Sequence, residues 1–155
     1  GAPAPPAVLE AIEGADVVVL SPGSLFTSTI PSLLGGGVRE ALARFGGPVL
    51  YAANVMTQPG ETSGFGAADH VRAISRHVGP VVTDVLVHRG RLPRAVLDRY
   101  AAKGAFPVEV DRGELEREGV RVREADLLSG RWEAGIRHDP EKLAREVCEA
   151  ALVRL

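Results

Sequence analysis

The sequence predicts an α/β fold in which a mainly parallel sheet lies between layers of helices. Two observations lead to this prediction. Short β-branched, apolar runs alternate along the chain with amphipathic helical stretches, and the runs are followed by polar loops. The chain also has the size of one domain, with 155 residues of which 45% are hydrophobic and 25% charged. Such a chain can bury one substantial core, but it has no room for two large domains.

The first half of the chain contains two strand–loop–helix units. The predicted elements are a helix at residues 8–15, a strand at 16–20, a helix from about 38 to 45, a strand at 48–53 and a helix at 67–77. Prolines at the start of the first helix suit its first turn. Helical spacing starts again at residue 30, but the three glycines at 35–37 interrupt it, so the second helix is expected to begin near Val38.

The second half continues the alternation and ends in an amphipathic helix. Its predicted elements are a strand at residues 81–87, a helix at 92–103, two short β-rich pieces at 107–110 and 120–123, and a helix at 140–155. Asp139 is expected to cap the last helix, with Pro140 at its first position. Strands that alternate with helices of about 10–15 residues form right-handed crossover units. The predicted architecture is therefore a Rossmann-like three-layer sandwich with a mainly parallel sheet.

Composition excludes several classes of function. A formal net charge of -2 provides no overall field that would draw the protein to nucleic acid or to a membrane surface, so we expect neither partner. Cys148 is the single cysteine and can form no internal disulfide, which favours a reducing compartment and predicts a cytoplasmic protein. No apolar run approaches the roughly 20 residues that span a bilayer. Residues 1–6 are interpreted as a linker at the start of a fragment.

The first polar loop, residues 21–28, follows the strand predicted at 16–20. Ligands of open α/β sheets bind beyond the carboxyl ends of the strands. Gly23 permits close approach of the backbone, and Ser24, Thr27 and Ser28 add hydroxyl donors that suit phosphate oxygens. The alternative is that Pro22 and Gly23 form a type II turn and that the hydroxyls only cap the next helix.

The second polar loop, residues 54–62, is rich in groups that recognise hydrogen-bonding edges. Its amides and hydroxyls are Asn54, Thr57, Gln58 and Thr62, and its turn formers are Pro59 and Gly60. Glu61 could accept a hydrogen bond from a base or a sugar hydroxyl, or act as a general base. Alternatively, Glu61 caps the helix that follows. Its place beside the first loop favours ligand contact.

The segment that opens the helix at 67–77 provides a carboxylate and an imidazole. The helix dipole favours a carboxylate at Asp69, so capping explains this residue without catalysis. A triad of Ser24 or Ser28 with Asp69 and His70 is disfavoured, because adjacent residues on a helix point in different directions. His70 and His77 share a helical face but lack a third ligand, so no metal site is expected. Magnesium could still accompany a phosphorylated ligand.

Three further side chains are candidates near the end of the chain. Arg137 precedes the last helix, where a guanidinium could clamp a phosphate bidentately, although a surface pair with Asp139 is the alternative. Tyr100 and Trp132 either stack on a base or close the core.

Four segments carry a resemblance to a known family. These are SPGSLFTS at 21–28, NVMTQPGET at 54–62, ADHV at 68–71 and RHD at 137–139. In this order they resemble the bacterial gluconeogenesis factor family, a relative of 2-phospho-L-lactate transferase. The resemblance implies a Rossmann-like protein about twice this length, in which residues 7–155 form the C-terminal portion of the nucleotide-binding domain. A strand and a glycine-rich loop would complete the site from outside this chain.

The resemblance also implies a function. Proteins of this family are cytoplasmic factors linked to gluconeogenic growth, peptidoglycan supply and cell shape, they bind UDP-N-acetylglucosamine, and they often self-associate, so a homo-oligomer is expected. By the family pattern Tyr100 and Arg137 contact the ligand. The predicted ligand-binding set, with no catalytic residue, is Gly23, Ser24, Leu25, Thr27, Ser28, Asn54, Thr57, Gln58, Gly60, Glu61, Thr62, Asp69, His70, Tyr100 and Arg137.

Two other functions stay open. The transferase branch moves a phospholactyl group from a guanosine diphosphate-activated donor to a deazaflavin precursor with magnesium, a role in which Asp69 or Glu61 would organise the metal or a base. That branch usually reads Pro-Ser-Asn at positions 22–24 and lacks the run at 56–62, so the sequence sides with the regulatory branch. The third hypothesis is a non-catalytic interaction scaffold. Apart from magnesium, no cofactor is implied.

Overall fold

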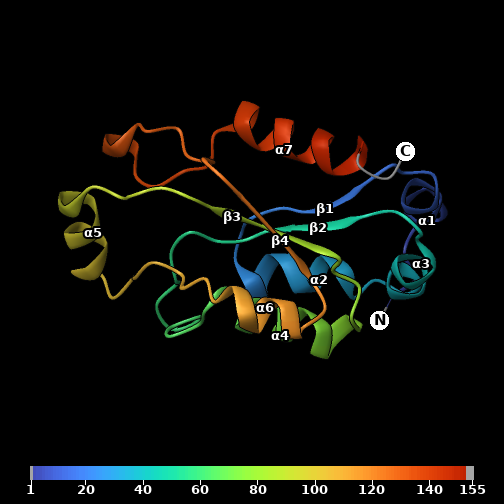
Figure 1. Ribbon diagram of the computed structural model, residues 1–155. Helices are drawn as coiled ribbons and strands as arrows, with labels where there is room; N and C mark the ends of the chain where they lie inside the picture. The colour runs from blue at the N-terminus through green and yellow to red at the C-terminus, as the bar shows by residue number, and fades with distance from the viewer. Residues whose placement is uncertain (1, 153–155) are drawn as a thin grey trace.

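A computed structural model of the protein describes residues 2–152 and contains a four-stranded parallel sheet (Figure 1). The strands are β1 (Val18–Leu20), β2 (Val49–Ala52), β3 (Asp84–His88) and β4 (Arg121–Ala125), in the order β1-β2-β3-β4. Each strand pairs with the next one along the chain, and all pairs are parallel. The carboxyl ends of all four strands therefore lie at one edge, which confirms the predicted parallel α/β fold.

Helices cover both faces of this sheet. They are α1 (Pro6–Glu13), α2 (Ile30–Leu33), α3 (Val38–Arg44), α4 (Ala67–Val78), α5 (Arg94–Ala101), α6 (Arg112–Arg117) and α7 (Pro140–Leu152). In Figure 1, α2, α4 and α6 lie on one face and α7 lies on the other. Helices α1 and α3 pack together at the end opposite α5. The third layer predicted from the sequence is thus supplied mainly by α7.

Alternate residues of the strands face different layers. On β2, Tyr51 is buried in the core under α4, whereas Leu50 packs with Leu86, Leu127 and Ala150 in a second core under α7. Burial of one such leucine contributes about 1.5–3 kcal/mol. Strands buried on both faces explain why their sequences are continuously apolar and do not alternate.

Most predicted elements are confirmed. The helix expected at 67–77 is α4, and Asp139 caps α7, because its Oδ1 accepts hydrogen bonds from the backbone N–H groups of Glu141 at 3.0 Å and Lys142 at 3.1 Å. The helix was expected to reach residue 155, and the part of that prediction at 153–155 lies outside the described residues. Its single cysteine, Cys148, is exposed.

One predicted strand is wrong. Residues 107–110 join no sheet, and Pro107 forms only an isolated bridge with Met56 while Val108 donates to the carbonyl of Val55. Proline cannot donate to a sheet ladder, which limits it to such edge positions. The segment therefore extends the loop that follows β2. Helix α6 was not predicted, because its six residues are too few to show a clear helical pattern. Asp111 caps its N-terminus.

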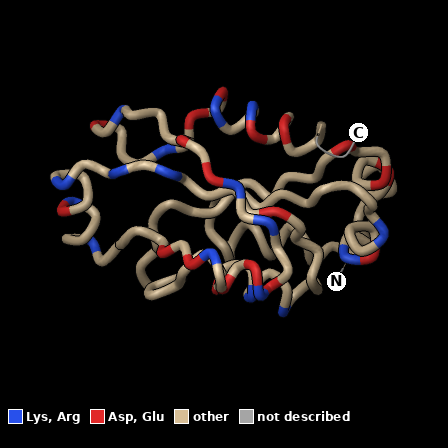
Figure 2. Tube along the Cα trace, viewed as in Figure 1, with Lys and Arg blue, Asp and Glu red and all other residues tan. Residues whose placement is uncertain are grey.

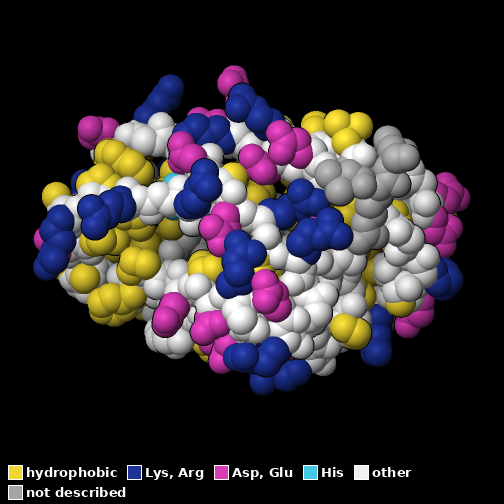
Figure 3. All heavy atoms as spheres, viewed as in Figure 1, with side chains coloured by type: hydrophobic (Ala, Val, Ile, Leu, Met, Phe, Trp, Pro, Cys, Tyr) yellow, Lys and Arg dark blue, Asp and Glu magenta, His cyan; other side chains and the backbone are white. Residues whose placement is uncertain are grey.

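Charges of both signs are mixed over the surface, as the trace in Figure 2 shows. Hydrophobic side chains gather on the surface at the end of the molecule that carries α5 (Figure 3). None of the helices formed by residues 2–152 combines the length and apolar character that crossing a membrane requires.

Candidate functional site

The loop after β1 turns into a short π-helix, η1 (Leu25–Thr29). Ser24 caps this turn, because its side chain accepts a hydrogen bond from Thr27 N at 3.2 Å and its carbonyl accepts from Thr29 N at 2.9 Å. Leu25 is fully buried and anchors the turn in the core, whereas Thr27 and Ser28 are exposed. The structure therefore realises the cap of this alternative at Ser24, but not the type II turn, because Gly23 does not have a positive φ.

A carboxylate of the second loop binds the first. Glu61 accepts hydrogen bonds from Ser24 Oγ, at 2.7 and 2.9 Å from its two oxygens, and from the backbone N–H of Phe26 at 2.8 Å. Orphan N–H groups at the start of a helical turn attract anions. Here the protein's own carboxylate occupies that position.

Asn54 joins the same two loops at a second point. Its Oδ1 accepts from Gly23 N at 3.2 Å, and its Nδ2 donates to Gly23 O at 2.8 Å. Two antiparallel hydrogen bonds between one amide and one backbone unit fix both loops in register. The side chain of Asn54 thus holds the two loops together.

Two threonines of the second loop are buried and bound to backbone. Thr57 Oγ1 accepts from Phe106 N at 2.9 Å, and Thr62 Oγ1 accepts from Gln58 N at 2.9 Å. Gly60 has a φ of 78°, a conformation that favours glycine. These three positions shape the loop and do not line the cavity described below.

The opposite side of the site comes from α5 and from the turn before α7. The 3-10 helix η2 (Trp132–Ala134) ends at Gly135, where a φ of 90° redirects the chain. The next backbone N–H, of Ile136, donates to the hydroxyl of Tyr100 at 2.9 Å. Arg137 is exposed and donates from Nε to Ala134 O at 3.2 Å. No partner among residues 2–152 is recorded for its two terminal nitrogens.

Together these segments enclose a cavity of about 460 Å³ at the carboxyl edge of the sheet. Its lining contains six of the predicted ligand-binding residues: Gly23, Ser24, Asn54, Gln58, Tyr100 and Arg137. Five lining residues were not among the predictions: Pro22, Val55, Met56, Ile136 and His138. The apolar ones carry no chemical signal in the sequence, but His138 lies within the RHD segment and could have been found there.

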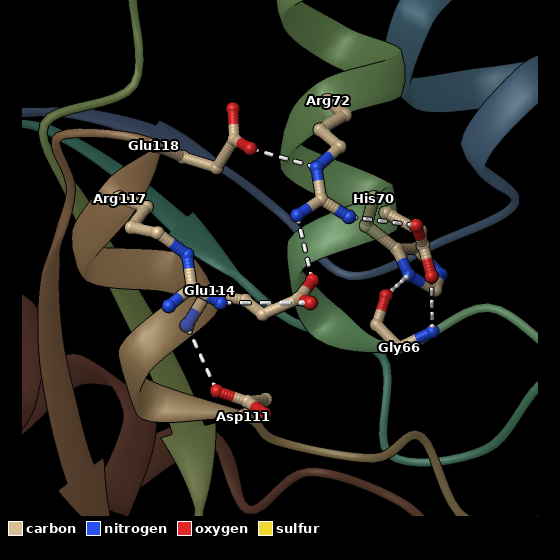
Figure 4. Close-up of polar contacts among 8 residues, drawn as sticks. Gly66, His70, Arg72, Asp111, Glu114, Arg117 and Glu118 are labelled. Carbon is tan, nitrogen blue, oxygen red and sulfur yellow. Dashed lines mark hydrogen bonds and ion pairs between the residues drawn. The ribbon is translucent and has the colours of Figure 1, made fainter.

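The remaining predicted residues lie outside this lining. Asp69 accepts from Gly66 N at 2.9 Å and so closes the first turn of α4. Its other oxygen accepts from Arg72 at 3.1 Å, and the same guanidinium contacts Glu114 at 2.6 Å and Glu118 at 2.7 Å (Figure 4). This group of charges joins α4 to α6. The capping interpretation of Asp69 is confirmed.

His70 is fully buried below the second loop. Its Nδ1 lies 2.8 Å from Gly66 O, its ring stacks on Tyr51, and Phe65 contacts it edge-on. Nδ1 therefore carries the proton, and Nε2 has no hydrogen-bond partner among residues 2–152. Burial lowers the pKa of His70, although the Gly66 carbonyl and the charges of Asp69 and Glu61 oppose this shift. The imidazole is neutral near pH 7.

A second pair of histidines lies beside the cavity. His138 lines it, and its Nε2 is buried with no hydrogen-bond partner in the described part of the chain. His88 accepts from Leu127 N at 3.2 Å and has Asp126 3.8 Å away. Burial lowers the pKa of both histidines, and His88 lowers that of His138 further. Within residues 2–152, no three His, Cys, Asp or Glu side chains are placed to hold a metal ion.

Comparison with known proteins identifies the family and agrees with this fold. The family model described as 2-phospho-L-lactate transferase CofD matches residues 1–128. Two proteins described as gluconeogenesis factors, from Halalkalibacterium halodurans and Bacillus subtilis, are 41% and 36% identical over 91% and 90% of this chain. A crystal structure of a Bacillus halodurans protein has a TM-score of 0.90 at 38% identity over 94% of this chain.

The chain spans only part of these proteins. It covers 44% of both gluconeogenesis factors, 47% of the crystallised protein and 32% of a longer relative from Nostoc. The shared fold, the identity over nine tenths of the chain and the match of the family model to residues 1–128 lead to one conclusion: the chain belongs to the CofD family, alongside the gluconeogenesis factors.

Proposed function

We propose that this chain forms one part of a nucleotide-sugar site, with UDP-N-acetylglucosamine as the ligand, in a factor that regulates and does not turn its ligand over. One observation carries the proposal. Arg137, with only Nε engaged, lies in the same cavity as Tyr100 and the side-chain amide of Gln58. A guanidinium suits phosphate, an aromatic ring suits a base or a sugar face, and an amide suits hydroxyls.

The size and position of the cavity support this proposal. Ligand pockets commonly have volumes of roughly 300–1,000 Å³, and this cavity of about 460 Å³ lies at the carboxyl edge where parallel α/β sheets bind nucleotides. Relatives named gluconeogenesis factors support the wider role. We therefore extend the proposal to control of gluconeogenic growth, peptidoglycan supply and cell shape through the state of this site.

Calorimetric titration of the full-length protein with UDP-N-acetylglucosamine tests the proposal. Loss of charge-assisted hydrogen bonds in Arg137→Ala should weaken binding about tenfold or more. Arg131→Ala, which removes an exposed arginine six residues earlier that does not line the cavity, is the matched control. No binding of the nucleotide sugar, or equal binding by both variants, would reject the proposal and favour an interaction scaffold.

A phospholactyl-type transferase is the second candidate, and the match to the transferase family model favours it. In this case the same cavity would hold a nucleotide diphosphate-activated donor. Incubation of the full-length protein with activated phospholactate, a deazaflavin acceptor and magnesium, followed by mass spectrometry, decides this candidate. A phospholactylated product supports it, and an unchanged acceptor rejects it.

A further inference from the structure

The two walls of the cavity have opposite hydrogen-bonding character. The loop wall comes from the segments after β1 and β2, which Asn54 clamps together through Gly23. The facing wall comes from Tyr100 of α5 and residues 136–138, which pair with the segment after β4 through Leu128 and His138. Because β2 and β3 lie between β1 and β4 in the sheet, these walls stand on different sides of the cavity.

The loop wall presents acceptors. A serine hydroxyl has one proton and two lone pairs. Ser24 gives its proton to Glu61, and its two lone pairs accept from the backbone N–H and the hydroxyl of Thr27, so it is fully engaged within the protein. Gln58 has a buried side-chain oxygen to which no group among residues 2–152 donates. Gln58 can therefore accept a hydrogen bond from a ligand, whereas the Ser24 hydroxyl cannot donate one to a phosphate.

The facing wall carries positive charge. Both terminal nitrogens of Arg137 lack a recorded partner among residues 2–152, and each can donate to an oxyanion. Asp139, two residues from Arg137, accepts from the backbone N–H groups of Glu141 and Lys142. Asp126 is bound by the ammonium of Lys142 at 2.6 Å.

We propose that the cavity binds its ligand in one orientation, with the phosphates at Arg137 and a neutral, hydroxyl- or amide-bearing group at Gln58, beside Ser24. This inference rests on the proposed function of the site. It reverses the expectation that the hydroxyls of the first loop contact phosphate. The preferred ligand then carries a neutral group with O–H or N–H donors next to its phosphates, as a nucleotide sugar does and a bare diphosphate does not.

Charge excludes phosphate from the loop wall. A phosphate oxygen in contact with Ser24 Oγ would lie within about 6 Å of the Glu61 carboxylate, since each contact in such a chain is about 2.7 Å long. Like charges at this separation repel, and a partly buried site screens them poorly. Glu61 thus repels phosphate at one wall and leaves Arg137 as its place of contact.

Binding of inorganic pyrophosphate to variants of the full-length protein distinguishes the contributions of the two walls. Arg137→Ala should weaken pyrophosphate binding about tenfold or more. Glu61→Gln should tighten it about threefold or more, because the repulsion is removed. Glu61→Asp retains the charge while it shortens the side chain, and should not tighten binding. Glu10→Gln, the same charge change on α1 at the far end of the molecule, is the control.

Each outcome decides the inference. Weaker pyrophosphate binding in Glu61→Gln, unchanged binding in Arg137→Ala, or tightening in Glu61→Asp to the same extent as in Glu61→Gln would overturn it. A parallel titration with UDP-N-acetylglucosamine tests the proposed function separately. If that ligand binds and the pyrophosphate pattern is reversed, only the orientation fails. If pyrophosphate follows the pattern and the nucleotide sugar does not bind, only the proposed function fails, and if neither binds, both do.

Discussion

Ser24 and Glu61, 37 residues apart in the chain, are joined by a hydrogen bond in which the serine hydroxyl donates to the carboxylate at 2.7 Å. The same carboxylate accepts from Phe26 N and so stabilises the turn that follows β1. One side chain therefore ties the loops of two neighbouring strands together. It also sets the polarity of the cavity beside them.

This bond should be measurable as a coupling free energy. We expect Ser24→Ala and Glu61→Gln each to lower the free energy of unfolding, and the double variant to lose less than the sum of the two, with a coupling of about 1 kcal/mol or more. Urea unfolding of the four proteins measures it. Additive losses would show that the two side chains contribute independently and that the contact does not stabilise the loops.

Sequence reasoning predicted the sheet and the position of the site well. Continuous apolar runs at β2 and β3 have few interpretations other than buried parallel strands, and the polar loops that follow β1 and β2 had to meet at one edge. The cap at Asp139 was predicted from an aspartate directly before Pro140 and an amphipathic stretch, and it is present. These features depend on neighbours in the chain, which a sequence displays directly.

The roles within the site could not be predicted in the same way. That Glu61 binds Ser24, and that Thr57 binds the backbone of Phe106, depends on contacts between residues 37 and 49 positions apart. Before the fold is known, a polar side chain in a loop is equally suited to a ligand or to a distant backbone group. The strand predicted at 107–110 was wrong for the same reason. A high β propensity indicates an extended segment, but it does not show whether that segment pairs with a sheet or with a loop.

Thr57 is expected to be structurally important. It is 4% exposed, and its hydroxyl accepts from Phe106 N while its own N–H donates to Phe106 O at 2.7 Å. Thr57→Val has a similar shape but leaves the Phe106 N–H without a partner, so the free energy of unfolding should fall by about 1–3 kcal/mol. Thr57→Ser keeps the hydroxyl and should lose less. Equal losses in urea unfolding would mean that the methyl group, and not the hydrogen bond, holds this loop.

Arg72 should contribute to the attachment of α6. Its guanidinium contacts Asp69, Glu114 and Glu118, and these hydrogen bonds raise its pKa above the ordinary value. Arg72→Ala should lower the thermal unfolding midpoint, and added salt should reduce the difference from the wild type because the group is partly exposed. Arg94→Ala, which breaks the more exposed pair with Asp98, is the matched control. Equal shifts of the unfolding midpoint in both variants would show that the contact of Arg72 with three carboxylates stabilises the protein no more than an exposed ion pair does.

Stability should depend on pH through the buried histidines. Burial lowers the pKa of His70 in the folded state, so below pH 6.5, the usual histidine value, the unfolded chain binds the proton more readily. His70 therefore makes its full contribution to stability above pH 6.5, and the free energy of unfolding decreases as the pH falls below this value. His88 and His138 act in the same direction. His70→Phe should reduce the slope just below pH 6.5 by up to about 1.4 kcal/mol per pH unit. An unchanged slope would contradict this.

Gly135 should tolerate no side chain. Its φ is 90°, and a Cβ atom there would lie 2.9 Å from the hydroxyl of Tyr100, which accepts from Ile136 N. Gly130 provides a matched control, since its φ is 72° but a Cβ would meet no atom within 4 Å. Gly130→Ala should cost about 1–2 kcal/mol for the backbone conformation alone. Gly135→Ala should cost more, because its φ of 90° with ψ of -175° is a conformation that essentially only glycine adopts and because the new Cβ also displaces Tyr100. Equal losses in urea unfolding would show that neither this conformation nor the contact with Tyr100 adds a cost.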